Sequence, residues 1–170
     1  MKAQKLELGT EEFDEIIEVA AIKVRNQEIT DVYSSLVKPM REIDAFIEEL
    51  TGITNAMLTD APSLDDILPE YMNFLSNDIL IGHNVSFDIN FLYDNLLSKN
   101  LPLITNDYVD TLRLSRKIYP EWKHHRLKDL VKNLNIDISS FMQFHRALGD
   151  CGILMACTAQ MMNDVVEKYG

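Results

Sequence analysis

The chain has 170 residues, a length that suits one domain with a substantial core. Its formal net charge is -11, from 16 Lys and Arg against 27 Asp and Glu. This acidity disfavours sequence-independent binding of duplex nucleic acid, which depends on Lys and Arg that neutralise phosphates. A nucleic-acid partner would therefore need metal ions and a few local basic residues to hold it, or a larger protein to deliver it.

The composition also argues against a membrane or secreted protein. No apolar run approaches the roughly 18 residues of a membrane span, and the N-terminal segment is too acidic for a secretion signal. Cys151 and Cys157 lie six residues apart in one expected helix and point to different sides, so we predict neither a disulfide framework nor a zinc site. Two packed thiols and a cytoplasmic location are the expectation.

The first half of the chain predicts a β-hairpin. Residues 16–24 are rich in β-branched side chains, residues 29–39 alternate and end at a proline, and Asn26-Gln27 lies between them. Further on, helices are expected over 43–50, 63–74, 86–98, 111–118, 126–134 and 147–167, and short strands over 78–82 and 108–110. Ser63 and Asp66 form a capping pair for the second of these helices.

This order of elements predicts an α/β fold. Hairpin strands followed by alternating helices and short strands indicate a mixed sheet with helices on both faces. Residues 78–82 are nearly continuously apolar, as expected of a strand in the middle of a sheet. The whole chain, 1–170, is expected to form one domain, and its site should lie where strands end and helices begin.

Two segments carry residues suited to phosphodiester chemistry. One runs from Gly82 to Asp88, GHNVSFD, and the other, HRALGD, from His145 to Asp150. Each places a carboxylate near the start or side of a helix, where it could hold a divalent cation. A neutral imidazole beside such a site could take a proton from water. Together these groups suit metal-assisted hydrolysis of a phosphodiester.

Each residue of the first segment also has a purely structural interpretation. Asp88 could simply be a first-turn acid favoured by the helix dipole. Asn84 could cap that helix through its side chain. A histidine such as His83 is most often packed and hydrogen-bonded.

The same holds for the second segment and for one further acid. A histidine that precedes a helix, as His145 does, is usually structural, and Asp150 near the start of that helix is also favoured by the dipole. Asp110 follows the strand at 108–110, where capping the next helix and supporting a site are equally good interpretations.

A basic and aromatic segment offers a possible nucleic-acid contact. His124, His125 and Arg126 could touch phosphate, although a solvated loop is the more common role for such a run. Tyr119 and Trp122 could stack on a base. Burial against the core is the expected role of both rings.

Five segments occur together in one order: FIEELTGITNAML, IGHNVSFDINFL, YVDTLRLSR, HHRLKDL and HRALGD. In this order they resemble the DnaQ-like, DEDDh-type 3'-5' exonucleases, and most of all the proofreading exonuclease domains of bacterial DNA polymerase III, of epsilon and PolC type. The resemblance covers nearly the whole chain. It implies a ribonuclease-H-like fold, a mixed sheet of about five strands flanked by helices, and two Mg²⁺ or Mn²⁺ ions.

The resemblance also implies roles for individual residues. Asp88 matches the acid of the family's second motif and Asp150 that of the third, which makes both metal ligands. His145 matches the general base. Asp110 matches a recurrent acid near the site and is expected to support the catalytic residues.

The chain departs from the family at the first motif, Asp-x-Glu on the first strand. If Glu7 fills the Glu position, Lys5 fills that of the Asp, so Glu7 is a weak candidate ligand and the first strand is degenerate or truncated. The missing Asp normally bridges both cations. Its loss is expected to lower the rate by several powers of ten, each worth about 1.4 kcal/mol of barrier.

The leading hypothesis is thus a metal-dependent 3'-5' exonuclease that releases nucleotides from single-stranded DNA, or short RNA, with impaired activity. The second is a catalytically inactive module of the same fold that binds a DNA polymerase subunit or a nucleic-acid end. A protein-interaction domain without any nucleic-acid role is the third.

Overall fold

The computed structural model describes the backbone of residues 2–8, 11–144 and 146–170, and the side chains of residues 15–144 and 146–170. The chain divides into two compact units. The N-terminal unit comprises Met1–Phe74 and Arg146–Leu148, and the C-terminal unit comprises Leu75–His145 and Gly149–Gly170. The prediction of one domain is therefore left as a prediction, and each unit is described by itself.

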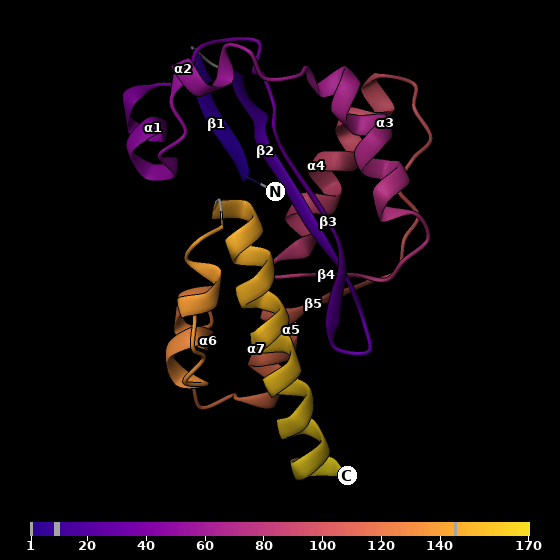
Figure 1. Ribbon diagram of the computed structural model, residues 1–170, viewed down its shortest axis with the longest axis vertical. Helices are drawn as coiled ribbons and strands as arrows, with labels where there is room; N and C mark the ends of the chain where they lie inside the picture. The colour runs from indigo at the N-terminus through magenta and orange to yellow at the C-terminus, as the bar shows by residue number, and fades with distance from the viewer. Residues whose placement is uncertain (1, 9–10, 145) are drawn as a thin grey trace. The chain divides into compact units, whose positions relative to one another are not determined.

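The N-terminal unit contains a three-stranded antiparallel sheet in the order β1-β2-β3 (Figure 1). Its strands are β1 (Lys2–Leu8), β2 (Glu11–Arg25) and β3 (Glu28–Leu36). The predicted hairpin is confirmed. Asn26 and Gln27 both have positive φ, 52° and 68°, as a two-residue hairpin turn of matching twist requires.

A first strand is present despite its polar sequence. β1 pairs with β2 at one edge of this sheet, with Lys5 opposite Asp14 and Glu7 opposite Glu12. Charged side chains are ordinary on an edge strand, where they discourage pairing with other chains. Whether the strand is degenerate or truncated stays a prediction.

Three helices complete the N-terminal unit: α1 (Ala45–Thr51), α2 (Asn55–Leu58) and α3 (Leu64–Leu75). The predicted capping pair at α3 is confirmed, since Ser63 Oγ donates to Asp66 Oδ2 at 2.7 Å and accepts from the Asp66 N–H at 3.3 Å. The core of the unit is an aliphatic cluster drawn from β2 and from residues 43–58: Ile17, Ile43, Ile47, Ile53 and Leu58.

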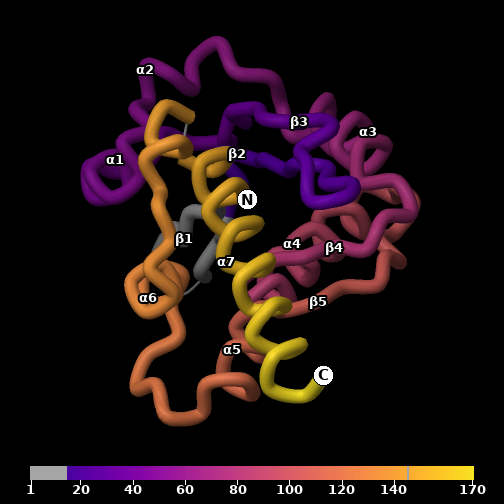
Figure 2. The backbone as a smooth tube through the Cα atoms, turned by 60° about the horizontal axis from the view of Figure 1, so that its bottom comes forward, coloured from indigo at the N-terminus to yellow at the C-terminus, as the bar shows by residue number. Residues whose placement is uncertain are grey.

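The C-terminal unit is built around two short parallel strands, β4 (Leu80–Gly82) and β5 (Tyr108–Asp110). Its helices are α4 (Val85–Ser98), α5 (Thr111–Ile118), α6 (Leu127–Asn133), the 3₁₀ turn η1 (Ser139–Phe141) and α7 (Arg146–Tyr169), whose first three residues belong to the N-terminal unit. Ile118, Leu130, Cys157 and Met161 form its core, and Figures 1 and 2 show α6 alongside α7.

The α/β class is confirmed, but the sheet differs from the prediction. Among the described residues the strands form one sheet of three and one of two, so each sheet has fewer strands than the predicted five. A central, buried strand over 78–82 is also wrong. β4 pairs with β5 in this two-stranded sheet, and Ile81 is 50% exposed. An apolar run predicts a strand, but it does not say how many neighbours the strand has.

Cys151 and Cys157 form no disulfide. Cys157 is fully buried, and burial raises the pKa of its thiol to about 11, which makes it unreactive. Cys151 is half-buried. Within the part of the chain that the structure describes, no helix combines the length and the apolar character needed to cross a membrane.

Candidate functional site

The carboxyl ends of β4 and β5 lie side by side and lead directly into α4 and α5. Gly82 is the last residue of β4, and a Cβ there would lie 2.6 Å from the Val85 side chain. Asn84 then takes the left-handed conformation, with φ 61°, in which Asn is one of the better tolerated residues. A tight turn thus brings the chain from the strand into α4 within three residues.

Asn84 does not cap α4 with its side chain, contrary to the prediction. Its backbone N–H instead donates to Asp110 Oδ1 at 3.0 Å. The left-handed backbone is the reason, because a capping side chain requires an extended residue at that position. The residue therefore contributes through its backbone conformation.

Asp110 joins the two strand ends. Its Oδ1 accepts from the Asn84 N–H and, at 2.9 Å, from the Leu112 N–H in the first turn of α5. The side chain is buried, with 8% exposure. The capping interpretation is therefore confirmed, and the same oxygen also holds the entry into α4. A supporting role in catalysis stays a prediction.

Thr111 reinforces this connection and was missed by the sequence analysis. Its fully buried hydroxyl donates to the Gly82 carbonyl at 3.1 Å and lies 3.0 Å from Nδ1 of His83. His83 is half-buried, and that burial lowers its pKa, so the ring is neutral at pH 7. The interpretation of His83 as a packed, hydrogen-bonded residue is confirmed. The sequence signal that could have identified Thr111 is its place directly after Asp110, the residue that caps α5.

Asp88 lies in the first turn of α4 and is half-buried. Burial raises the pKa of its carboxyl above the ordinary 3.8, because the charged form loses solvation. No described residue donates a hydrogen bond to it or pairs with its charge. Its place near the helix N-terminus suits both the dipole interpretation and the role of a ligand that awaits a cation.

Asp150 is exposed on α7, which begins four residues earlier at Arg146. Two glycines flank it in sequence and let the helix lie close to η1. A Cβ at Gly149 would lie 3.2 Å from the Phe141 carbonyl oxygen, and one at Gly152 would lie 2.5 Å from the Phe141 ring. These glycines are a structural signal that the sequence analysis did not use.

His145 and the side chain of Glu7 lie outside the described residues, so the predicted general base and the weak ligand candidate stay predictions. Among the residues whose side chains are described, no group of three or more His, Cys, Asp or Glu could hold a metal ion. Asp88 and Asp150 supply the carboxylate oxygens that Mg²⁺ prefers. The described donors do not form a complete metal site.

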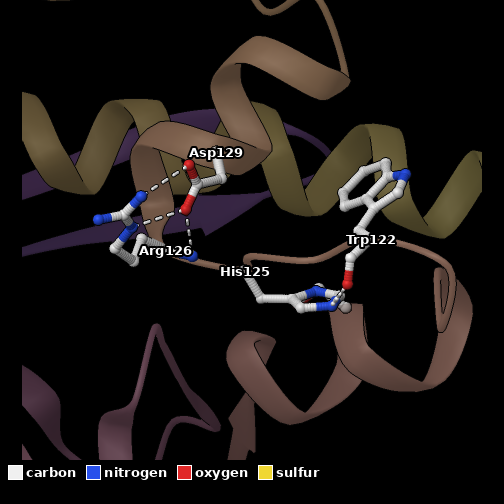
Figure 3. Close-up of polar contacts among 5 residues, drawn as sticks. Trp122, His125, Arg126 and Asp129 are labelled. Carbon is white, nitrogen blue, oxygen red and sulfur yellow. Dashed lines mark hydrogen bonds and ion pairs between the residues drawn. The ribbon is translucent and has the colours of Figure 1, made fainter.

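His124 and Arg126 in the basic run at 124–126 are exposed, which agrees with the solvated-loop interpretation, and a phosphate contact stays a prediction. Figure 3 shows the local contacts of His125 and Arg126. His125 is half-buried and uses both ring nitrogens: Nε2 donates to the Trp122 carbonyl, and Nδ1 lies 3.1 Å from Ser115 Oγ. Arg126 forms an ion pair with Asp129 at 2.8 Å, and Asp129 also accepts from the Arg126 backbone N–H to begin α6. Two of the three residues thus serve local structure, because the helix start and the turn before it need donors.

The aromatic pair of this segment is packed, as expected. The Tyr119 and Trp122 rings stack with centroids 3.9 Å apart and planes 9° apart. Both rings contact the core cluster of the C-terminal unit. One face of each ring is therefore engaged with the other ring, and both residues pack on the core.

Comparison with known proteins identifies the family of this chain. The family model for exonucleases, RNase_T, matches residues 6–158. PolC-type DNA polymerase III of Bacillus subtilis is 41% identical over 159 residues, which cover 92% of this chain and 11% of the relative. DNA polymerase III subunit epsilon of Aquifex aeolicus is 34% identical over 159 residues, covering 94% and 77%. This chain therefore spans about a tenth of its PolC-type relatives.

Solved structures show the same fold. Exonuclease X in complex with 5' overhanging duplex DNA superposes with a TM-score of 0.69 at 28% identity, covering 91% of this chain and 86% of the other. The nuclease domain of 3'hExo, a DEDDh family member bound to rAMP, gives 0.72 at 18% identity, covering 89% and 82%. The fold is therefore that of the ribonuclease-H-like DEDDh exonucleases.

The chain belongs to the DnaQ-like exonuclease family and is related to the proofreading exonucleases of bacterial DNA polymerase III. The resemblance inferred from the sequence motifs is thereby confirmed. The family and the fold support a nuclease that hydrolyses phosphodiesters, and exonucleases of this type generally use divalent metal ions.

Replacing Asp110 with Ala should lower the free energy of unfolding by about 1–3 kcal/mol, because it removes a helix cap and leaves the Asn84 N–H without its acceptor. Urea unfolding measures the change. Asp107→Ala is the control, since this acid is exposed, and its effect should stay within about 0.5 kcal/mol. Equal losses in the two variants would contradict the role of the Asp110 carboxylate.

Asp88→Asn should stabilise the metal-free protein at neutral pH. A carboxyl whose folded pKa is raised binds protons more tightly in the folded state, so wild-type stability falls as pH rises from 3.8 through the folded pKa. The advantage of the variant should disappear below pH 3.8. Urea unfolding in EDTA at both pH values tests this, with the exposed Asp94→Asn as control. A variant less stable than wild type at neutral pH would count against it.

Proposed function

We propose that this chain is a 3'-5' exonuclease domain that releases nucleotides from the 3' end of single-stranded DNA, at a rate reduced by its altered first motif. The single observation that carries the proposal is Asp88, a half-buried carboxylate without a described partner, which the sequence resemblance matches to the acid of the family's second motif. Exonuclease X, a structural relative solved with DNA, supports DNA as the substrate. Short RNA is the alternative substrate.

The residues act in distinct ways in this proposal. Asp88 and Asp150 would hold Mg²⁺ or Mn²⁺, with Glu7 as a weak third ligand. When bound, such ions, two in the family's mechanism, would supply charge to orient the attacking water and to stabilise the leaving oxygen. His145 accepts the proton of that water. Asp110 supports the site by holding the start of α4, and with it Asp88, against the end of β5.

The reduced rate follows from Lys5. If Glu7 fills the Glu position of the family's first motif, the ammonium group of Lys5 replaces the carboxylate of its Asp. Positive charge there would oppose cation binding, and the site would lack one carboxylate ligand. We propose activity several powers of ten below that of a complete site, each power being about 1.4 kcal/mol of barrier.

The relatives also suggest partners. They are components of DNA polymerase III, and this chain matches 11% of the PolC-type and 77% of the epsilon-type proteins. We propose that a polymerase subunit presents the strand end to this domain. Replication is a cytoplasmic process in bacteria, and a cytoplasmic location belongs to the same proposal.

The second candidate function is a catalytically inactive module that binds a strand end or a polymerase subunit. One assignment and one observation favour it. If Glu7 fills the Glu position of the first motif, Lys5 stands where the family has an acid. The described side chains do not form a complete metal site. Such a module would keep the fold and lose hydrolysis.

The exonuclease proposal predicts that Mn²⁺ raises the unfolding temperature of the wild type and does not raise that of Asp88→Asn. A 3'-labelled single-stranded oligonucleotide should be shortened in the presence of Mn²⁺, and His145→Ala should abolish this digestion. Thermal unfolding and gel electrophoresis measure the two effects. Strand binding without either effect would support the inactive module instead.

Restoring the acid of the first motif should raise activity. Lys5→Asp should increase the rate of digestion by about 10-fold or more, because one such ligand is worth at least one power of ten in rate. Lys2→Asp makes the same charge change elsewhere in β1 and should leave the rate within about twofold, a difference of less than 0.5 kcal/mol in barrier. Equal effects of the two changes would refute the assignment of Lys5 to the motif.

A further inference from the structure

Positive charge is concentrated in one part of this acidic chain. Residues 113–132 contain seven of the 16 Lys and Arg and two of the 27 Asp and Glu. The segment thus has a net charge of +5, while the rest of the chain carries -16. Such a segment can attract a polyanion that the protein as a whole would repel.

The cations of this segment are accessible. Arg126 is neutralised by Asp129. The other six are exposed, and none has an ion-pair or hydrogen-bond partner among the described residues: Arg113, Arg116, Lys117, Lys123, Lys128 and Lys132. We call these six residues the basic segment cations. Their charges are available to a ligand because no neighbouring acid occupies them.

Helical spacing groups these cations on solvent faces. Arg113, Arg116 and Lys117 follow an i, i+3, i+4 pattern on α5, whose other face buries Thr111, Ser115 and Ile118. Lys128 and Lys132 lie one turn apart on α6. Lys123 lies in the connection between the two helices. Positive charge therefore continues from α5 through the loop to α6.

The connection between α5 and α6 is held in place. His125 links it to Ser115 of α5 and to the Trp122 carbonyl (Figure 3). The stacked rings of Tyr119 and Trp122 pack on the core of the unit. The cations are therefore carried by an ordered scaffold, which lowers the entropic cost of arranging them around a ligand.

The basic segment begins close to the candidate site. Arg113 and Arg116 lie on α5, whose first residue, Thr111, donates its hydroxyl to the Gly82 carbonyl and lies 3.0 Å from Nδ1 of His83. His83 lies between β4 and α4, and α4 carries Asp88. A strand whose end reaches Asp88 would therefore have its preceding phosphates near the start of the basic segment.

The chemistry of the segment favours a nucleic acid over a protein partner. Protein interfaces usually have an apolar core, yet no large hydrophobic side chain between residues 113 and 132 is exposed. The aromatic pair is stacked together and packed against the core, which leaves it less available to a base. What remains is charge, which recognises phosphates and does not distinguish bases.

We propose that the basic segment cations bind the phosphate backbone of the single-stranded nucleic acid whose 3' end enters the candidate site. This inference rests on the proposed function and extends it with a second contact along the strand. Binding should be governed by counterion release, with a slope of about 0.7 in log K against log salt for each phosphate neutralised on a single strand. Base sequence should have little influence.

The test compares two variants that change net charge equally. The first carries Lys117→Gln, Lys123→Gln and Lys128→Gln in the basic segment. The control carries Lys38→Gln, Arg41→Gln and Lys99→Gln. Fluorescence anisotropy of a fluorescein-labelled oligothymidylate is measured with the full chain in EDTA, from low to physiological salt. The first variant should lose about 2 from the salt slope, and the control should keep the wild-type slope.

Other outcomes overturn the proposal. One is that the wild type does not bind the oligonucleotide at low salt. Another is that the three proteins have equal salt slopes. A third is that polyglutamate displaces the labelled oligonucleotide as well as an unlabelled one does, which would indicate an acidic protein partner. Replacing the same three lysines with Arg should restore the slope, and a failure to do so also counts against it. Because EDTA prevents hydrolysis, the binding result does not depend on whether the protein is an active exonuclease. If the protein is active and the salt slope of the first variant is unchanged, this inference is refuted and the proposed function stands.

Discussion

The arrangement of the candidate site depends on one carboxylate oxygen, Oδ1 of Asp110, which accepts two backbone N–H groups. One belongs to Asn84 at the entry of α4, and the other to Leu112 in α5. Two parallel strands that end side by side must each turn into a helix, and both turns leave backbone donors without a partner. A single buried acid satisfies one donor from each turn. Thr111 adds a second link through the Gly82 carbonyl, so the turn from β4 into α4, the helix that carries Asp88, is held against β5 and α5.

Local structure was largely predictable from the sequence. The strand at 108–110 and the helix at 111–118 have the predicted bounds, because a cap residue and a proline mark the two ends of the helix. The hairpin followed from alternation and a two-residue turn. The prediction that the Asn84 side chain caps α4 was wrong. An Asn before a helix can cap it with its side chain or take a left-handed backbone conformation, and the sequence does not distinguish the two. His125 was also unpredictable, because its partner Ser115 becomes a neighbour only after α5 forms and the chain turns back.

The relation between strands was less predictable than the strands themselves. The apolar run at 78–82 suggested a central strand, yet β4 pairs with β5 in a two-stranded sheet. Pairing depends on segments distant in sequence, which no local pattern records. The candidate site has the same difficulty. Motif order identified Asp88, Asp150 and His145 through a family resemblance, whereas charge and spacing alone left a structural role for each. The same resemblance showed that the chain departs from the family's first motif, where Lys5 is assigned to the position of an acid. Composition alone could not reveal this departure.

The two glycines near Asp150 have a consequence for how this part of the protein forms. Gly149 and Gly152 each weaken a helix by roughly 1 kcal/mol relative to Ala, since a glycine backbone is free in the unfolded chain. The opening turns of α7 therefore have little tendency to fold unaided, and they gain stability only once Phe141 packs against them. Hydrogen exchange at the Asp150 amide should accordingly be faster than in the later turns around Met161, so that this acid lies in the less stable part of the helix.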